Sequence, residues 1–235
     1  MIECRVCGAP NSDLALTCTQ CKSFLQAKVD TLDLFATAWG VIESPAKAFK
    51  RVVLAKRKNY VFFLSVLMGM GAVLTAASLH NLGPALGGLP GVVGAVILGG
   101  IVIGMLGVPM LASMLVAAAR MLGGTGGIRP VMAVIVYASA PALAILIAVA
   151  PIKLAIFGQY LFDHNPSPMV LAPGLYIVLT VLEGLGALWS LALMGVGLSV
   201  ATGLRGIRPV ALALLAGALA GGLMWALRFV RTALA

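Results

Sequence analysis

The chain contains five stretches of about 20 or more residues that are almost entirely apolar, and these stretches constrain its fold more than any other feature. A helix of about 20 residues crosses the roughly 30 Å hydrocarbon layer of a bilayer. Composition agrees, because 10% of the residues are charged, whereas soluble domains carry roughly 25%. The stretches lack the alternation that is typical of strands in a membrane barrel. The sequence therefore predicts an all-α membrane protein with a five-helix transmembrane bundle.

The chain divides by composition into three regions. They are a cysteine-containing region at 1–28, a linker with a basic amphipathic helix at 29–59, and a five-span membrane domain at 60–235. The predicted spans are about 60–79, 91–119, 130–150, 170–201 and 209–229. The second span carries Pro109 and several glycines, which predicts a kink or close packing against a neighbouring helix. The pentapeptide GIRPV occurs at 127–131 and 206–210. Duplication of a helical hairpin and repeated helix-start chemistry both explain this repeat.

Lysines and arginines are distributed unevenly around the predicted spans, and this asymmetry predicts an orientation. One side would hold every Lys and Arg up to Lys58, together with Arg120, Arg129, Arg205 and Arg208. The other side would hold Lys153, Arg228 and Arg231. The positive-inside rule therefore predicts a multi-pass protein of the inner (cytoplasmic) membrane, with the N-terminus in the cytoplasm and the C-terminus outside.

Six basic residues gather in SPAKAFKRVVLAKRK, at 44–58, just before the first span. They are Lys47, Lys50, Arg51, Lys56, Arg57 and Lys58. The segment predicts an amphipathic helix in the inner headgroup layer, where these residues would contact anionic lipids. A plain topology anchor explains the same residues. Because so much of the positive charge lies here, we assign the net charge of +9 to a membrane surface and expect no nucleic-acid partner.

The four cysteines, Cys4, Cys7, Cys18 and Cys21, form the pattern C-x2-C-x10-C-x2-C. Two such pairs complete a tetrahedral thiolate site for Zn²⁺, and four thiolates leave no open position for a reacting water. The pattern predicts a structural zinc ribbon whose folding depends on the metal. Gly8 suits the first turn, whereas Lys22 stands where a second glycine would be expected. Two disulfides or a redox dithiol are the alternatives, and a reducing cytoplasm disfavours the disulfides.

Glu183 is the only acid well inside a predicted span. Ionisable groups at that depth usually face the interior of a bundle and are functional candidates. The predicted boundaries place no basic residue deep in another span, so we expect no ion pair. Tyr137, Ser139 or protonation of the acid would satisfy the carboxyl instead. A proton carrier, a cation ligand and a purely structural group all remain open for Glu183.

Three segments resemble the Yip family of small five-span membrane proteins. They are ESPAKAFKRVV before the first span, YASAP at 137–141, and LWSLALMGVGLSVATGLRGIRPVALALL across the last two spans. The start of the chain is similar to the zinc ribbons that precede many prokaryotic membrane domains. The resemblance implies a five-span fold over about 40–230. Eukaryotic relatives bind small Rab-type GTPases through cytosolic regions, but a segment of that kind is not recognisable here.

These observations favour an integral membrane scaffold or adaptor whose zinc ribbon docks an unidentified cytoplasmic protein. A small transporter or channel that uses Glu183 is the alternative. We find no phosphate-binding loop, nucleophile elbow or HExxH motif, so we expect no enzymatic activity. The small-residue spacing of Gly217 and Gly221 is typical of helix packing within a bundle, and it is also compatible with a homo-oligomer.

Overall fold

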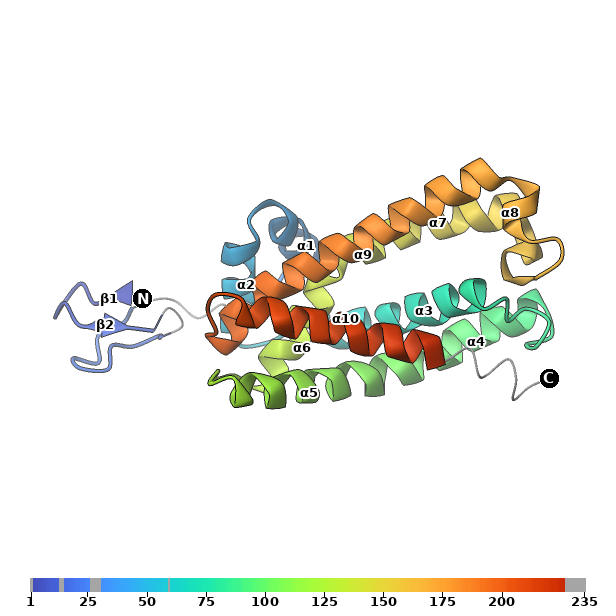
Figure 1. Cartoon of the computed structure of the whole chain (residues 1–235). Coiled ribbons are helices and arrows are strands. Elements are labelled where there is room, and N and C mark those ends of the chain that lie inside the picture. The colour runs from blue at the N-terminus through green and yellow to red at the C-terminus, as the bar shows by residue number, and fades with distance from the viewer. Residues whose placement is uncertain (1, 13–14, 26–30, 59, 227–235) are drawn as a thin grey trace.

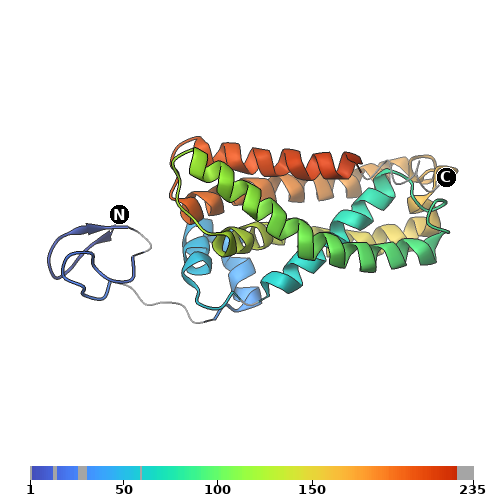
Figure 2. The same cartoon turned by 90° about the horizontal axis from the view of Figure 1, so that it is seen from below.

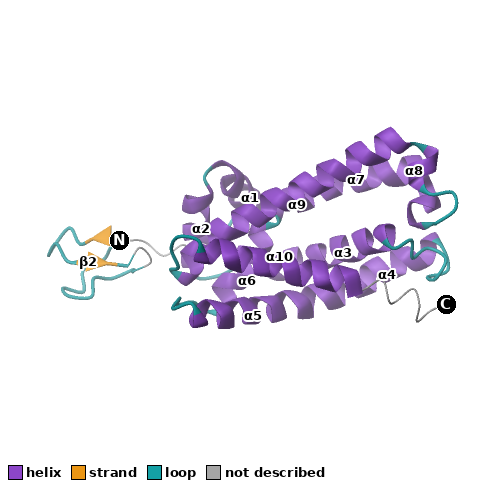
Figure 3. Ribbon diagram, in the orientation of Figure 1, coloured by secondary structure: helices purple, strands orange, loops and turns teal. Residues whose placement is uncertain are grey.

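The computed structural model describes residues 2–12, 15–25, 31–58 and 60–226. A small cysteine module lies beside one end of a long helical bundle (Figure 1). Two predicted features fall outside the described residues: the end of the fifth span, and the side of the membrane assigned to Arg228 and Arg231. Within the described part of the chain, strands are confined to the cysteine module (Figure 3).

The module is built from two short antiparallel strands, β1 (Ile2–Glu3) and β2 (Pro10–Asn11). A single bridge between Thr17 and Phe24 ties its second half. Its buried apolar residues are few: Cys4, Ala9 and Cys18, with Leu25 packed against them. A core of this size supplies little folding energy.

The bundle contains ten α-helices and two irregular helical turns among the described residues. The α-helices are α1 (Leu34–Glu43), α2 (Pro45–Leu54), α3 (Val61–Leu79), α4 (Leu89–Val102), α5 (Val108–Met121), α6 (Ile128–Ala138), α7 (Ala140–Phe157), α8 (Pro168–Leu171), α9 (Pro173–Thr202) and α10 (Arg208–Ala226). The π-helical turn η1 (Ile103–Gly107) joins α4 to α5, and the 3-10 turn η2 (Gly158–Phe162) follows α7.

Five segments are long and apolar enough to cross a membrane. They are Val61–Leu79, Leu89–Met121, Ala140–Phe162, Pro173–Thr202 and Arg208–Ala226. Between 22 and 33% of each is buried inside the bundle, so the remaining apolar surface faces outward and requires lipid. The predicted fold class, an all-α membrane bundle of five spans, is confirmed.

The third span differs from the predicted 130–150, because it begins at Ala140 and extends to Phe162. The residues before it form α6, a separate helix of 11 residues that is about 16 Å long and too short to span. Every residue from Val131 to Ala138 is buried. A helix that is apolar on all sides belongs in a core, so the sequence pattern could not distinguish α6 from the start of a span.

The apolar side of α2 packs against the bundle. Phe49 and Val52 are fully buried, and the Phe49 ring lies against Gly197 of α9, where an added Cβ would come within 3.1 Å of it. Lys58 donates hydrogen bonds to carbonyls at the end of α2, including that of Val52 at 2.8 Å. The amphipathic pattern of α2 thus marks a helix that docks on protein, and lipid contact by its exposed residues Lys47 and Arg51 stays a prediction.

The predicted close packing of the second span is a direct backbone contact with α3. An added Cβ at Gly100 would lie 2.7 Å from the Met70 Cα, and one at Gly104 would lie 2.3 Å from the Ser65 carbonyl oxygen. Gly69 of α3 faces the same contact. Figure 2 shows α3 (teal) crossing the green α4–α5 segment. Small residues let the two helices approach without intervening side chains.

Candidate functional site

The four cysteine sulfurs converge in the module. All four Sγ atoms lie within 4.8 Å of one another. The Cys4 and Cys21 sulfurs are 3.6 Å apart, and those of Cys7 and Cys18 are 3.5 Å apart. Zinc at about 2.3 Å from each sulfur would space tetrahedral ligands about 3.8 Å apart, whereas a disulfide needs about 2.05 Å. No disulfide joins any of the four cysteines, and the spacing of the donor set fits a metal.

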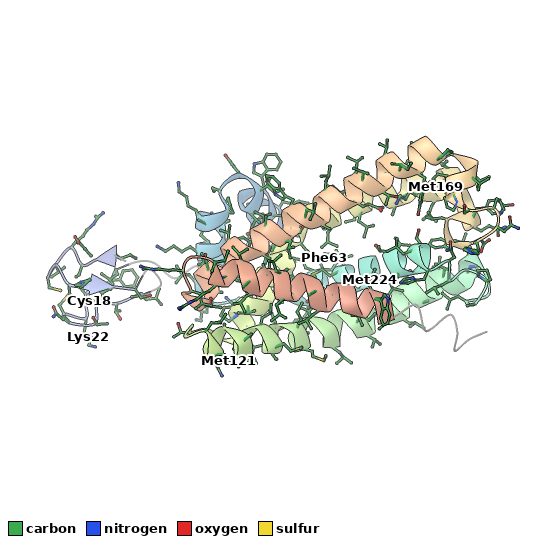
Figure 4. All side chains as sticks on the ribbon, in the orientation of Figure 1. Cys18, Lys22, Phe63, Met121, Met169 and Met224 are labelled. Atoms are coloured by element: carbon green, nitrogen blue, oxygen red, sulfur yellow. The ribbon has the colours of Figure 1, made fainter. Side chains whose placement is uncertain are left out.

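The two halves of the module repeat one backbone turn. The amide of Gly8 donates to the Cys4 carbonyl at 2.8 Å, and the amide of Lys22 donates to the Cys18 carbonyl at 3.2 Å. Gly8 has φ +70° and Lys22 has φ +59°. Glycine adopts this left-handed conformation freely, whereas a side chain is strained there by about 1 kcal/mol. Lys22, labelled in Figure 4 beside Cys18, therefore takes the glycine position despite its side chain.

Asn11 supports the cysteine cluster from within the module. It is buried, its amide nitrogen donates to the Cys18 sulfur at 3.6 Å, and its carbonyl oxygen accepts from the Thr19 amide at 2.9 Å. Backbone amides, that of Cys21 first, and the Asn11 contact lower the pKa of the Cys18 thiol. The thiolate is the form that binds metal, so these contacts favour the metal-binding state.

Ser23 lies between two of the sulfurs. Its hydroxyl is 3.1 Å from the Cys4 sulfur and 3.0 Å from the Cys21 sulfur. The hydrogen bond from Ser23, helped by backbone amides, lowers the pKa of the Cys4 thiol to about 6. Asn11 and Ser23 were not singled out from the sequence, because a polar residue beside a cysteine carries no signal until the turn brings it to the sulfur.

Glu183 forms an ion pair with Lys153, contrary to the sequence-based expectation. The Lys153 ammonium of α7 lies 2.6 Å from Glu183 Oε2 of α9, and it also donates to Thr180 Oγ1 at 3.2 Å. The ring of Tyr176 lies 5.3 Å from the ammonium. Lys153 is only 5% exposed. The prediction was wrong because the third span begins ten residues later than expected, which moves Lys153 from a loop into the bundle.

The other intramembrane candidate, Tyr137, lies elsewhere in the bundle. Its side chain is fully buried on α6 within the main hydrophobic core. The hydroxyl of Ser139 donates to the Ile135 carbonyl at 2.8 Å. The partner of the Glu183 carboxylate is thus Lys153 of α7, and neither Tyr137 nor Ser139 takes that place.

A model of the Yip1 domain matches residues 39–227. The chain belongs to the Yip1 domain family. The match begins within α1 and includes all five candidate spans, so the resemblance seen in the sequence is confirmed for the membrane domain. The cysteine module lies outside the Yip1 match. Neither a curated protein nor a solved structure matches the chain.

Proposed function

We propose that this Yip1-domain protein is a membrane adaptor whose cysteine module binds Zn²⁺ and docks a protein partner at the cytoplasmic face. The observation that carries the proposal is the construction of the module. Twin turns bring four free thiols within 4.8 Å of one another. Four thiolates would close the coordination sphere, so the metal's contribution would be to structure.

Zinc would supply most of the folding energy of the module. The module buries only a handful of apolar residues, and domains below about 40 residues usually need a metal or disulfides to fold. The residues that would hold the ion are Cys4, Cys7, Cys18 and Cys21. Asn11 and Ser23 would orient their sulfurs.

Two apolar side chains on the surface of the module support a docking role. Val6 is 74% exposed and Phe24 is 72% exposed. Val6 lies between the first pair of cysteines and Phe24 follows the second pair. Exposed apolar residues on so small a module are candidates for anchoring a partner, because aromatic anchors often dominate binding energy. The Yip1 family assignment supports protein partners in general.

The experiment is affinity purification from native membranes in mild detergent, followed by mass spectrometry. Four chains are compared: the intact chain, a chain without residues 1–28, Phe24→Ser and Phe35→Ser. Phe35 is the matched control, since it is 84% exposed on α1, outside the module. A specific partner should be retained by the intact chain and by Phe35→Ser, and lost from the other two. Recovery of the same proteins from all four chains would overturn the docking proposal.

Transport through the bundle is the second candidate function. The observation that favours it is that Glu183 lines a cavity between α3, α7, α9 and α10. The Lys153 ammonium compensates its charge, which makes the acid less available as an independent proton or cation site. The double variant Lys153→Met with Glu183→Leu separates the candidates, because it removes the carboxylate without leaving the Lys153 charge unpaired. Partner capture should survive this change, and proton- or cation-coupled flux in proteoliposomes should not.

A further inference from the structure

A cavity of about 390 Å³ lies within the membrane part of the bundle. It is bounded by α3, the start of α7, α9 and α10. Figure 1 shows the α7–α9 pair diverging from α3 and α10 toward the end opposite the cysteine module. Met224, labelled in Figure 4, lines the cavity from α10. Its volume falls within the range of about 300–1,000 Å³ that small-molecule sites occupy.

The wall of the cavity is chemically divided. Most of its lining is apolar, with Ala72 of α3 and Leu143 of α7 as examples. Glu183 and Thr180 form a polar part of the wall. They also line an adjoining hollow of about 40 Å³, which Lys153 lines as well. Thr75 and Ser139 are the other polar residues of the lining. The wall is therefore mostly apolar with one charged position, Glu183, and a ligand that fits it is amphiphilic.

The ion pair defines the kind of head group. Among the described residues, the carboxylate of Glu183 receives hydrogen bonds only at Oε2. The Lys153 ammonium has three N–H groups and uses two of them, toward Glu183 and Thr180. Among the described residues, Glu183 Oε1 and the third N–H of Lys153 therefore have no other hydrogen bond, and the pair carries no net charge. An anionic head would be opposed by Glu183 and a cationic head by Lys153. A hydroxyl both donates and accepts, so it matches both groups.

We infer that the cavity binds a neutral, hydroxyl-headed amphiphile with a single chain, taken from the bilayer. The hydroxyl group lies at the Lys153–Glu183 pair, and the chain lies along the apolar wall. Access is from the side of α9, because Gly184 is exposed and lines the cavity next to Glu183. This site is independent of the cysteine module and of any partner bound there.

Gly184 offers a steric test of the site. An added Cβ at Gly184 meets nothing within 4 Å, and Gly184 lines the cavity. We therefore expect Gly184→Leu to reduce the space for a ligand without a clash at its Cβ. Gly222 of α10 is the matched control. It is also exposed, and an added Cβ there also meets open space, but it lies outside the cavity lining.

The assay measures binding of tritiated 1-monooleoylglycerol to the purified full-length chain in detergent, by scintillation proximity. We expect saturable binding that Gly184→Leu weakens by at least about tenfold, with Gly222→Leu unchanged. The affinity of the double variant Lys153→Met with Glu183→Leu for the probe should also fall by about tenfold. That factor corresponds to roughly 1.4 kcal/mol, about one hydrogen bond. Oleate and oleylamine, which carry the same chain with charged heads, should compete poorly.

Two results would overturn the inference. If Gly184→Leu binds the probe as the intact chain does, the cavity is not the site. If oleate or oleylamine competes as well as unlabelled 1-monooleoylglycerol, the Lys153–Glu183 pair does not select a neutral hydroxyl. Circular dichroism and gel filtration verify that each variant is folded. Should the double variant fail to fold, Gly184→Leu and the head-group competition still decide the question.

Discussion

Replacing Glu183 by glutamine, or Lys153 by methionine, leaves one charge without its partner inside the bundle. At the observed separation of 2.6 Å, the Coulomb attraction is about 6 kcal/mol with an effective dielectric constant of about 20. Removing the two ions from water costs several kcal/mol for each, so the intact pair contributes little net stability. Breaking the pair is different, because the remaining charge stays buried without a partner. The free energy of unfolding of each single variant should therefore fall by about 3–5 kcal/mol.

The double variant Lys153→Met with Glu183→Leu supplies the contrast. It removes both charges and keeps similar side-chain volumes, so its free energy of unfolding should lie within about 1 kcal/mol of that of the intact chain, or above it. The measurement is an SDS titration in mixed micelles, with unfolding followed by circular dichroism. If the losses of the two single variants simply add in the double variant, the two groups are not coupled and the ion pair does not explain their burial.

Three further predictions concern the two glycine-dependent regions and the metal. Lys22→Gly should strengthen zinc retention against a chelator by about 1 kcal/mol, because it relieves the strain of a side chain in the left-handed conformation. Gly8→Ala should weaken zinc retention by a similar amount. Equal retention by both variants would contradict the equivalence of the two turns. Gly100→Ala should lower the free energy of unfolding by about 1–3 kcal/mol through its clash with Met70, whereas Gly94→Ala, with open space around the added Cβ, should not. If the module holds zinc as proposed, a chelator should make all four cysteines reactive toward a thiol reagent while the helical circular dichroism signal persists. Loss of that signal would show that the bundle depends on the module.

The cysteine cluster was predictable from sequence because its ligands are close along the chain. Two CxxC pairs determine both the donor atoms and the local turns, and the structure brings the same four sulfurs together. Asn11 and Ser23 were not predictable, since their contacts with sulfur depend on how the turns fold. Lys22 shows the limit of residue preference, because the repeated turn overrides the poor fit of its side chain to φ +59°.

The number of spans was also predictable, but two assignments within the membrane domain required tertiary contacts. The apolar run through α6 and α7 exceeds one span, and nothing in its periodicity marks Ser139 as a boundary. Because the predicted span ended at residue 150, Lys153 was placed in a loop and was not expected to reach Glu183. The apolar face of α2 has the pattern of a membrane-surface helix, yet the Phe49 ring packs against Gly197 of α9. An amphipathic pattern specifies an apolar neighbour without stating whether it is lipid or protein.

The complete burial of α6 determines when the protein can finish folding during synthesis. Its neighbours include α2 and α5, which precede it in the chain, and α9, which follows it. A ribosome that has completed α7 has produced α6 without the helix that covers one of its sides. The core can therefore close only after Thr202, the last residue of α9, has been made. Until then α6 must be sheltered by lipid, by the insertion machinery or by a chaperone, and ribosome pausing between α7 and α9 would prolong that exposure.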